Sequence, residues 1–182
     1  MDFKLKKTVA LVGMMGAGKT AVGTALARQL DVPFLDSDAE IELAADRTIA
    51  EIFERDGEAF FREKESQVIA RLLQEKRCIL STGGGAFLAP RNREFIGQTG
   101  VAVWLKADLD ILWMRVRHKT TRPLLMTDDP HETLRQLCDI REPSYANARI
   151  VVDAKPELSI EQMAQKVIDA LLEHPDVLEK TS

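Results

Sequence analysis

The stretch that decides the fold is Gly13-Met14-Met15-Gly16-Ala17-Gly18-Lys19-Thr20, which follows the pattern G-x-x-x-x-G-K-[ST]. Before it lies a short apolar run, residues 8–12, rich in the residue types that a buried parallel strand needs. After it, Val22, Leu26 and Leu30 recur four residues apart, as they do on one face of a helix. This order of strand, glycine loop and helix predicts a phosphate-binding loop.

The chemistry of such a loop follows from its backbone. Glycines allow N–H groups to curve around a phosphate, and the start of the following helix adds the positive end of its dipole. We expect Lys19 to reach the β- and γ-phosphates of a nucleotide and the Thr20 hydroxyl to bind Mg²⁺. The alternative is a glycine-rich turn with a solvated lysine, which the flanking strand and helix disfavour.

Length and composition limit the kind of protein. The 182 residues are enough for a substantial core, and we expect a single domain over residues 1–182. A formal net charge of −4 and a pI of about 5.5 argue against nucleic acid or an anionic membrane as the main partner. The first residues lack the apolar stretch of a signal peptide, and no run is long enough to span a bilayer. Cys78 and Cys138 have neither metal-ligand nor redox spacing, so we expect buried thiols and a cytoplasmic location.

Strands and helices alternate along the chain. Strands are predicted at residues 8–12, 33–36, 78–82, 101–105 and 149–153. Helices are predicted between and after them, with capping residues at Ser37, Thr48, Asp108, Asp129 and Ser159. The core should run from about 8 to 172, and residues 174–182 should fray. Such alternation predicts a parallel sheet covered by helices on both faces, with ligands bound at the carboxyl ends of the strands.

Two acids follow the second predicted strand, Asp36 at its tip and Asp38 in the first turn of the next helix. A kinase needs one carboxylate near Mg²⁺ and another that accepts or orients the attacking hydroxyl. Asp36 and Asp38 suit these two roles. The alternative is that Asp38 only favours the helix dipole and that Asp36 is solvated.

The third predicted strand ends in Gly83-Gly84-Gly85. Glycine allows a backbone to approach a ligand closely and to present N–H groups to its oxygens, although three glycines can also form a loose turn. Ser81 and Thr82 stand at this strand end, where a generic ATPase would have an acid. This departure favours a family with a different metal site.

Three arginines lie near the predicted strand-end cleft: Arg62, Arg122 and Arg141. The planar fork of an arginine matches carboxylates and phosphates with two parallel hydrogen bonds. An acidic protein that keeps arginines there is suited to hold an anion. For each arginine taken separately, a solvated or surface-paired side chain is the alternative.

Taken in order, these motifs resemble those of the shikimate kinase family. The resemblance rests on Gly13–Thr20, Asp36-Ser37-Asp38, Phe61-Arg62, Gly83–Gly85, Arg122-Pro123-Leu124-Leu125 and Arg141 with Tyr145, and it runs from about residue 8 to 172. It implies an α/β fold of the nucleoside-monophosphate-kinase type, in three α/β/α layers with a five-stranded parallel sheet in the order 2-3-1-4-5. It also implies ATP-dependent phosphorylation of the 3-hydroxyl of shikimate, on the route to chorismate and aromatic amino acids, with Mg²⁺ as the cofactor.

The resemblance further implies roles for individual residues. Lys19, Asp38 and Arg122 would be catalytic, with Arg122 on a lid over about 119–129, and Thr20 and Asp36 would hold the metal. Arg115 and Lys155-Pro156 would flank the adenine. The full ATP site would comprise Gly13, Met14, Met15, Gly16, Ala17, Gly18, Lys19, Thr20, Ala21, Arg115, Arg122, Lys155 and Pro156. The shikimate site would comprise Asp38, Arg62, Gly83, Gly84, Gly85 and Arg141.

The sequence departs from the family pattern at one place, and three other functions are alternatives. The family has acidic residues after the tyrosine, whereas Ala146-Asn147-Ala148 follows Tyr145 here, so the contacts of that loop stay open. The main alternative is a gluconate-kinase-like small-molecule kinase, against which the paired arginines and the triple glycine argue. A nucleoside monophosphate kinase lacks its base-recognition features here, and a GTP-binding switch would need an Asn-Lys-x-Asp run that neither asparagine begins. We expect a monomer whose partners are shikimate and ATP, and neither nucleic acid nor a membrane.

Overall fold

The computed structural model describes residues 2–118 and 125–181 of the chain. Its centre is a sheet of five parallel strands, which occur in space in the order β3-β4-β2-β5-β6. The strands are β2 (Thr8–Val12), β3 (Phe34–Asp36), β4 (Ile79–Ser81), β5 (Gly100–Lys106) and β6 (Ile150–Asp153). One further strand precedes β2, so this order is the predicted 2-3-1-4-5, and the predicted fold class is confirmed.

The central position of β2 in the sheet explains why its sequence is continuously apolar. It pairs with β4 on one side, where Val9 lies opposite Ile79, and with β5 on the other, where Val12 lies opposite Trp104. All five of its residues are buried, because helices cover both faces of the sheet. A strand in this position has no solvent face, so the alternation of polar and apolar residues is lost.

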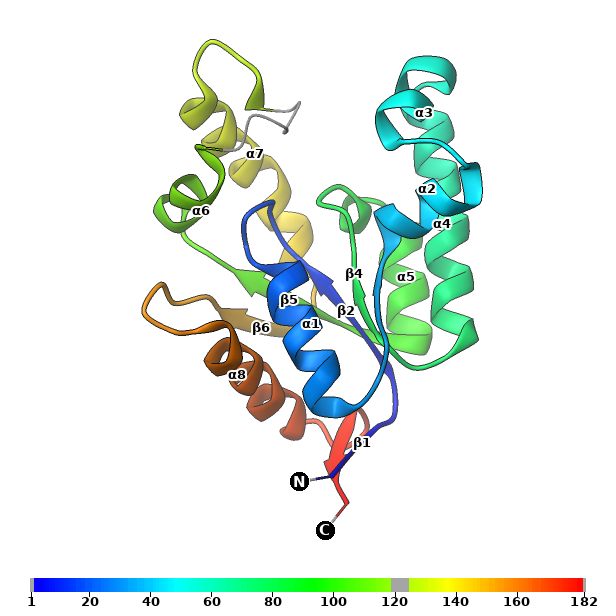
Figure 1. Cartoon of the computed structure of the whole chain (residues 1–182), viewed down its shortest axis with the longest axis vertical. Coiled ribbons are helices and arrows are strands. Elements are labelled where there is room, and N and C mark those ends of the chain that lie inside the picture. The colour runs from blue at the N-terminus through cyan, green and yellow to red at the C-terminus, as the bar shows by residue number, and fades with distance from the viewer. Residues whose placement is uncertain (1, 119–124, 182) are drawn as a thin grey trace.

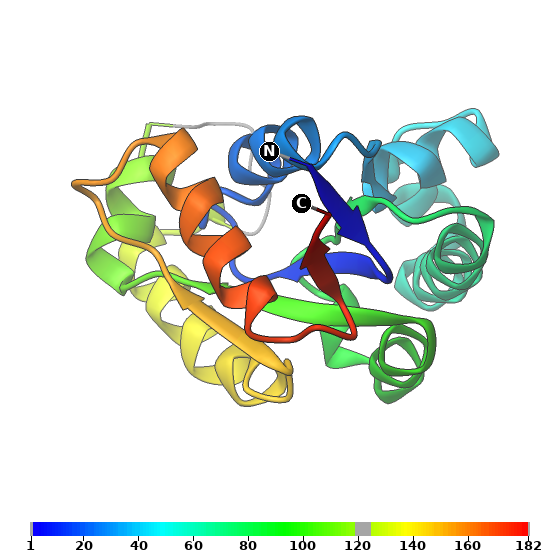
Figure 2. The ribbon, with the colours of Figure 1, turned by 90° about the horizontal axis from the view of Figure 1, so that it is seen from below.

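Helices form the two outer layers (Figures 1 and 2). Helices α1 and α8 lie together on one face of the sheet, and α5 and α7 lie on the other, with α4 packed beside α5. The helices are α1 (Lys19–Leu30), α2 (Ser37–Ala45), α3 (Ile49–Asp56), α4 (Glu58–Glu75), α5 (Pro90–Thr99), α6 (Leu109–Val116), α7 (Pro130–Tyr145) and α8 (Ile160–Leu172), with a 3₁₀ turn, η1 (Ala86–Leu88). The loops that follow β2, β3 and β4 emerge at the same edge of the sheet (Figure 1).

Of the five predicted helix caps, three are confirmed and Ser37 is wrong. Asp108 occupies the N-cap position of α6, but its side chain makes no capping hydrogen bond among the described residues. The side chains of Thr48, Asp129 and Ser159 each accept a hydrogen bond from a backbone N–H in the first turn of the helix that follows. Ser37 does not cap α2, because it is already the first residue of the helix. The N-cap is Asp36, the last residue of β3, whose backbone is extended. Asp36 Oδ1 accepts from the N–H of Asp38 at 2.9 Å and of Ala39 at 3.3 Å.

The described part of the C-terminal segment, up to residue 181, packs onto the rest of the chain, contrary to the prediction that residues 174–182 fray. Residues Leu178–Lys180 form β7, which pairs antiparallel with β1 (Phe3–Leu5), so the two termini lie side by side (Figure 1). Val177 and Leu178 are fully buried, and Arg149 makes two hydrogen bonds of 2.8 Å to the Asp176 carboxylate. The pairing strand lies at the other end of the sequence, which is why local composition did not predict it. Within the described residues, no helix has the length and apolar character needed to cross a membrane.

Candidate active site

The predicted phosphate loop joins β2 to α1 in the expected way. Gly13, Gly16 and Gly18 have φ of 146°, 84° and 97°, a region that residues with a side chain rarely adopt. Among the described residues, no side chain caps the start of α1, whose N-cap is Gly18. The first N–H groups of the helix therefore remain available to an anion at this point.

The side chains of the loop differ in their exposure to solvent. Met14 and Ala17 are buried, whereas Thr20 and Ala21 are exposed on the first turn of α1. Lys19 Nζ donates a hydrogen bond to the Gly13 carbonyl oxygen. The lysine thus curls back over the loop, where a phosphate would lie.

Of the residues predicted to flank the adenine, Arg115 contacts the phosphate loop, whereas Lys155 and Pro156 lie in an exposed loop. Arg115 of α6 donates from Nη1 to the Gly16 carbonyl oxygen at 3.0 Å, so it lies directly on the phosphate loop. Lys155 and Pro156 are exposed after β6, the strand next to β5 at the same sheet edge. Of the predicted lid, Arg122 and residues 119–124 lie outside the described residues. In its remaining part, Leu125 is buried and Asp129 caps α7.

The triple glycine after β4 is where the other predicted residues meet. Each glycine is approached by a different charged side chain, so closely that a side chain on the glycine would displace it. A Cβ atom on Gly83 would lie 2.9 Å from Asp38 Oδ1, and one on Gly84 would lie 2.7 Å from Arg141 Nη1. A Cβ atom on Gly85 would lie 2.5 Å from Arg62 Nη2.

The arrangement therefore brings one carboxylate and two guanidinium groups from three helices to a single stretch of backbone. The segment is held in place from the side as well, since the Gly83 N–H donates to the Ser37 hydroxyl at 3.3 Å. Ser37 is thus a contact between α2 and the glycines rather than a helix cap. Glycine leaves room here for the charged ends of Asp38, Arg141 and Arg62, a use that the sequence alone does not show.

Asp38 carries an unusual carboxylate. Its pKa is raised, mainly because burial disfavours the charged form and also because Asp36 lies nearby, while Lys19 and Arg62 act in the opposite direction. Its Oδ1 atom is buried without a hydrogen-bond partner among the described residues. A buried carboxylate oxygen without a partner is costly, so this atom is available for a hydroxyl or an ion supplied by a ligand.

Glu65 is a site residue that the sequence analysis missed. It is fully buried on α4, and its Oε1 atom accepts from Arg62 Nη1 at 2.9 Å. Burial raises the pKa of its carboxyl, which Arg62 opposes, and its Oε2 atom has no partner in the described part of the chain. A signal was present, because Glu65 stands in the apolar stripe formed by Phe61 and Ile69 at helical spacing.

Arg141 and Tyr145 lie one turn apart near the end of α7. Arg141 is 8% exposed and Tyr145 is fully buried. The Tyr145 hydroxyl donates to the Gly84 carbonyl oxygen at 2.6 Å. In the segment after this tyrosine, where the sequence departs from the family, the Asn147 side-chain amide donates to the carbonyl oxygens of Pro143 and Ser144 at 3.2 and 3.0 Å. Asn147 therefore closes the helix end with a donor, which an ionised acidic residue could not supply.

The predicted metal residues fit a magnesium ion that is held only in part by protein. No group of three or more acidic, histidine or cysteine side chains suited to a metal occurs in residues 2–118 and 125–181. Mg²⁺ commonly takes one or two protein ligands together with substrate phosphates and water, so such a group is not needed. Oxygen donors are present, since Thr20 lies in the first turn of α1, and Asp36 and the partnerless Asp38 Oδ1 lie at the end of β3, which β4 separates from β2.

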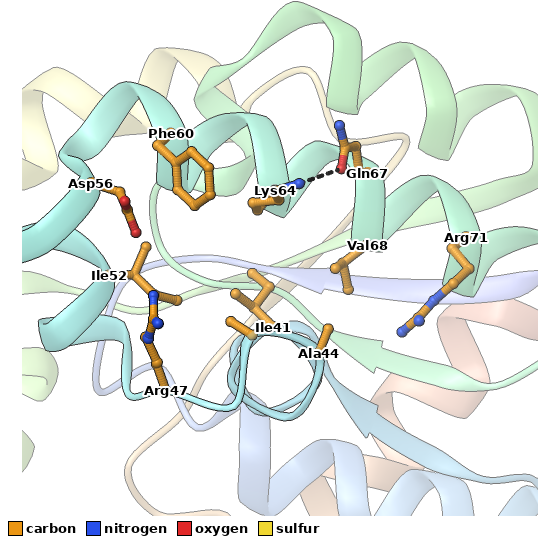
Figure 3. Close-up of a pocket in the computed structure, with 11 residues that line it drawn as sticks. Ile41, Ala44, Arg47, Ile52, Asp56, Phe60, Lys64, Gln67, Val68 and Arg71 are labelled. Atoms are coloured by element: carbon orange, nitrogen blue, oxygen red, sulfur yellow. Dashed lines mark hydrogen bonds between the residues drawn. The ribbon is translucent and has the colours of Figure 1, made fainter.

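A pocket of about 380 Å³ lies between α2, α3 and α4 (Figure 3). Ile41, Ile52 and Val68 contribute its apolar surface, and Arg47, Lys64 and Arg71 contribute cations. None of the predicted site residues lines it. The pocket is therefore not part of the candidate active site.

Comparisons with known proteins agree with the motifs. The family model described as Shikimate kinase matches residues 15–172. A shikimate kinase of Cereibacter sphaeroides is 68% identical over 176 residues, which cover 97% of this chain and 88% of that protein. The solved structure of shikimate kinase from Acinetobacter baumannii in complex with shikimate is 40% identical, with a TM-score of 0.85, and the match covers 92% of this chain and 93% of that one.

A gluconokinase structure bears on the main alternative. The enzyme from Sinorhizobium meliloti is 17% identical to this chain with a TM-score of 0.64, and the match covers 93% of this chain and 94% of that one. At this identity the likeness concerns the fold alone.

Proposed function

Because the chain belongs to the shikimate kinase family, we propose that it transfers the γ-phosphoryl group of ATP to the 3-hydroxyl of shikimate. The products are shikimate 3-phosphate and ADP, on the route to chorismate and the aromatic amino acids. The observation that carries this function is the meeting of Asp38, Arg62 and Arg141 at the three glycines. A hydroxy acid offers a hydroxyl for the carboxylate and a carboxylate for the two guanidinium groups.

On the nucleotide side, the loop backbone and the start of α1 hold the phosphates through N–H groups. Lys19 binds the β- and γ-phosphates and stabilises the charge that develops on the transferred group. Arg115 lies against the adenine, with Lys155 and Pro156 on its other side. Arg122, on a lid over about 119–129, adds a second cation to the phosphates when ATP is bound.

On the acceptor side, Arg62 and Arg141 grip the carboxylate of shikimate, and the backbone of Gly83–Gly85 lies against its ring. Asp38 accepts a hydrogen bond from the 3-hydroxyl and orients or deprotonates it during transfer. The raised pKa and the partnerless Oδ1 atom of Asp38 support this role, because substrate binding supplies the missing hydrogen bond.

Magnesium suits the oxygen donors at this edge of the sheet. Thr20 and Asp36 would hold the ion, Asp36 on the side away from its capping contact or through water, since its Oδ1 accepts from Asp38 and Ala39. When bound, Mg²⁺ neutralises charge on the β- and γ-phosphates. We place the enzyme in the cytoplasm as a monomer, with shikimate and ATP as its partners and no nucleic acid or membrane.

A substrate panel tests this function. We expect ADP release, followed with a coupled assay, to depend on ATP, Mg²⁺ and shikimate, and to remain at background with gluconate or AMP as the acceptor. Turnover with gluconate and none with shikimate would contradict the assignment and favour the sugar-acid alternative. Chelation of Mg²⁺ should abolish turnover and its re-addition should restore it, which tests the metal separately.

A further inference from the structure

Tyr145 contacts both halves of the proposed site, although none of the proposed roles uses it. Its ring is fully buried and lies against Trp104 of β5, with the ring centroids 5.8 Å apart. Its hydroxyl donates to the Gly84 carbonyl oxygen at 2.6 Å on the acceptor side. The same oxygen lies 3.9 Å from the Met14 sulfur in the phosphate loop.

The hydrogen bond from Tyr145 to the Gly84 carbonyl oxygen orients a whole peptide unit. The Gly84 C=O and the Gly85 N–H belong to one trans peptide unit, so they point in opposite directions. A hydroxyl that holds the carbonyl therefore also aims the N–H away from itself. Glycine has a wide choice of backbone angles, so two consecutive glycines do not keep one peptide orientation unaided.

Arg141 joins the same contact from one turn earlier on α7. Its guanidinium and the Tyr145 hydroxyl approach the same glycine: a Cβ atom on Gly84 would lie 2.7 Å from Arg141 Nη1 and 3.8 Å from the Tyr145 hydroxyl oxygen. A tyrosine hydroxyl has one proton to donate and lone pairs to accept. With its proton directed at Gly84, its oxygen keeps lone pairs for the neighbouring Arg141 guanidinium, so one hydroxyl can restrain both groups. Burial raises the pKa of Tyr145 to about 12, so the hydroxyl keeps its proton at neutral pH.

We propose that Tyr145 is a positioning residue for the acceptor: its hydroxyl holds the Gly84–Gly85 peptide and the Arg141 guanidinium in the orientation that receives shikimate. It acts through these two groups and does not itself touch the substrate. This inference rests on the proposed function, since it requires Arg141 and the glycine backbone to bind the acceptor. It predicts that removal of one oxygen atom affects shikimate far more than ATP.

The test variant is Tyr145→Phe, which keeps the buried ring and its packing on Trp104. We expect the KM for shikimate to rise about threefold to tenfold, the effect of one net hydrogen bond, and the KM for ATP to change by less than about twofold. The melting temperature should also fall by a few degrees, because the Gly84 carbonyl loses its partner. Stability alone would not separate positioning from ordinary packing, so a control is needed.

Thr8→Val is a matched control. The Thr8 side chain is also buried, and its hydroxyl accepts from the Cys78 N–H at 3.2 Å and donates to the Lys76 carbonyl at 3.4 Å. It begins β2, at the opposite end of the strand from the phosphate loop. This variant likewise removes one buried hydroxyl that bonds to backbone. It should lower the melting temperature and leave the KM values for both substrates unchanged.

The outcomes of these experiments separate the role of Tyr145 from the proposed function. An unchanged shikimate KM in Tyr145→Phe, or an equal rise in Thr8→Val, would overturn it while wild-type turnover leaves the proposed function intact. Absence of wild-type turnover with shikimate would overturn both. In an Arg141→Lys background Tyr145→Phe should have a smaller effect, since both changes act on one contact, and full additivity would count against that link. In wild-type protein, shikimate should also shift the Gly85 amide resonance, and an unshifted resonance would refute the role of this peptide.

Discussion

The two glycine-rich segments of the site use glycine for different physical reasons. In residues 13–18, three glycines have positive φ, so the shape of the backbone itself requires them. In residues 83–85 none has positive φ, and a Cβ atom added to any of these glycines would instead lie within 2.9 Å of a charged side chain from another element. The backbone shape of the first segment is therefore set within one stretch of chain, although Leu105 and Val116 also lie close to Gly13 and Gly16. The second segment has a function only together with α2, α4 and α7.

This difference predicts how the two segments respond to change. A substitution in the phosphate loop strains the backbone and damages nucleotide binding. A substitution at the triple glycine pushes away the end of a charged side chain, so it should damage acceptor binding with little strain. The following four experiments test this contrast, from the largest expected effect to the smallest.

Lys19→Met tests the nucleotide segment and should have the largest effect. Removal of a cation that stabilises the transferred phosphoryl group should lower turnover about a thousandfold or more, since each factor of ten is about 1.4 kcal/mol. The protein should stay folded by circular dichroism. Near-wild-type turnover in the purified variant would show that the loop is not the site of transfer.

Arg141→Ala tests the acceptor segment. Truncation of one partner of a shielded arginine–carboxylate contact is worth about 2–4 kcal/mol, so the KM for shikimate should rise about thirtyfold to a thousandfold. The KM for ATP should move far less. Arg141→Lys should recover only part of the loss, because a point charge does not reproduce the planar fork. A weakened ATP site with normal shikimate binding would move this arginine to the nucleotide side.

Asp38→Asn tests the carboxylate between the two segments. Turnover should fall about a hundredfold if Asp38 orients or deprotonates the acceptor hydroxyl. The variant should be at least as stable as the wild type at pH 7, because burial raises the pKa of Asp38 and so penalises its charged form. High turnover with an altered Mg²⁺ requirement would instead exchange the roles of Asp36 and Asp38.

The pH dependence of this stability difference has a definite sign. Below the ordinary aspartate pKa of 3.8, Asp38 is neutral in both the folded and the unfolded chain, so the variant gains nothing. As the pH rises from 3.8 through the raised pKa of the folded state, the unfolded chain ionises more readily and the wild type loses relative stability. Melting curves of both proteins at several pH values between 3 and 8 should therefore diverge as the pH rises.

Paired glycine substitutions should give the smallest effect and the sharpest contrast. Gly85→Ala meets the flexible end of Arg62, so we expect about a tenfold rise in the shikimate KM with little change in melting temperature. Gly16→Ala has φ of 84° and meets Val116, so we expect a clear loss of stability and a raised ATP KM. Gly97→Ala, in α5 with open space around it, is the control and should leave both KM values unchanged. The same signature at positions 16 and 85 would contradict the contrast.

Much of the fold could be predicted from local sequence. The phosphate loop, the alternation of strands and helices, and the caps at Thr48 and Ser159 each depend on residues within a few positions of one another. Propensity, glycine conformation and capping act over such short distances, so the sequence displays them directly. The order of the five strands followed from the resemblance of the motifs to a known family.

The tertiary structure alone decided how the acceptor site is assembled. Arg62, Gly84 and Arg141 are far apart in the chain, and the sheet order and the packing of α4 and α7 bring them together. The partners of Glu65 and of the Tyr145 hydroxyl, Arg62 and the Gly84 carbonyl oxygen, were likewise visible only in the tertiary structure. The ordered terminus has the same explanation, because β7 pairs with a strand at the other end of the chain. Contacts of this kind depend on where the backbone has already been placed, and local sequence carries no record of that placement.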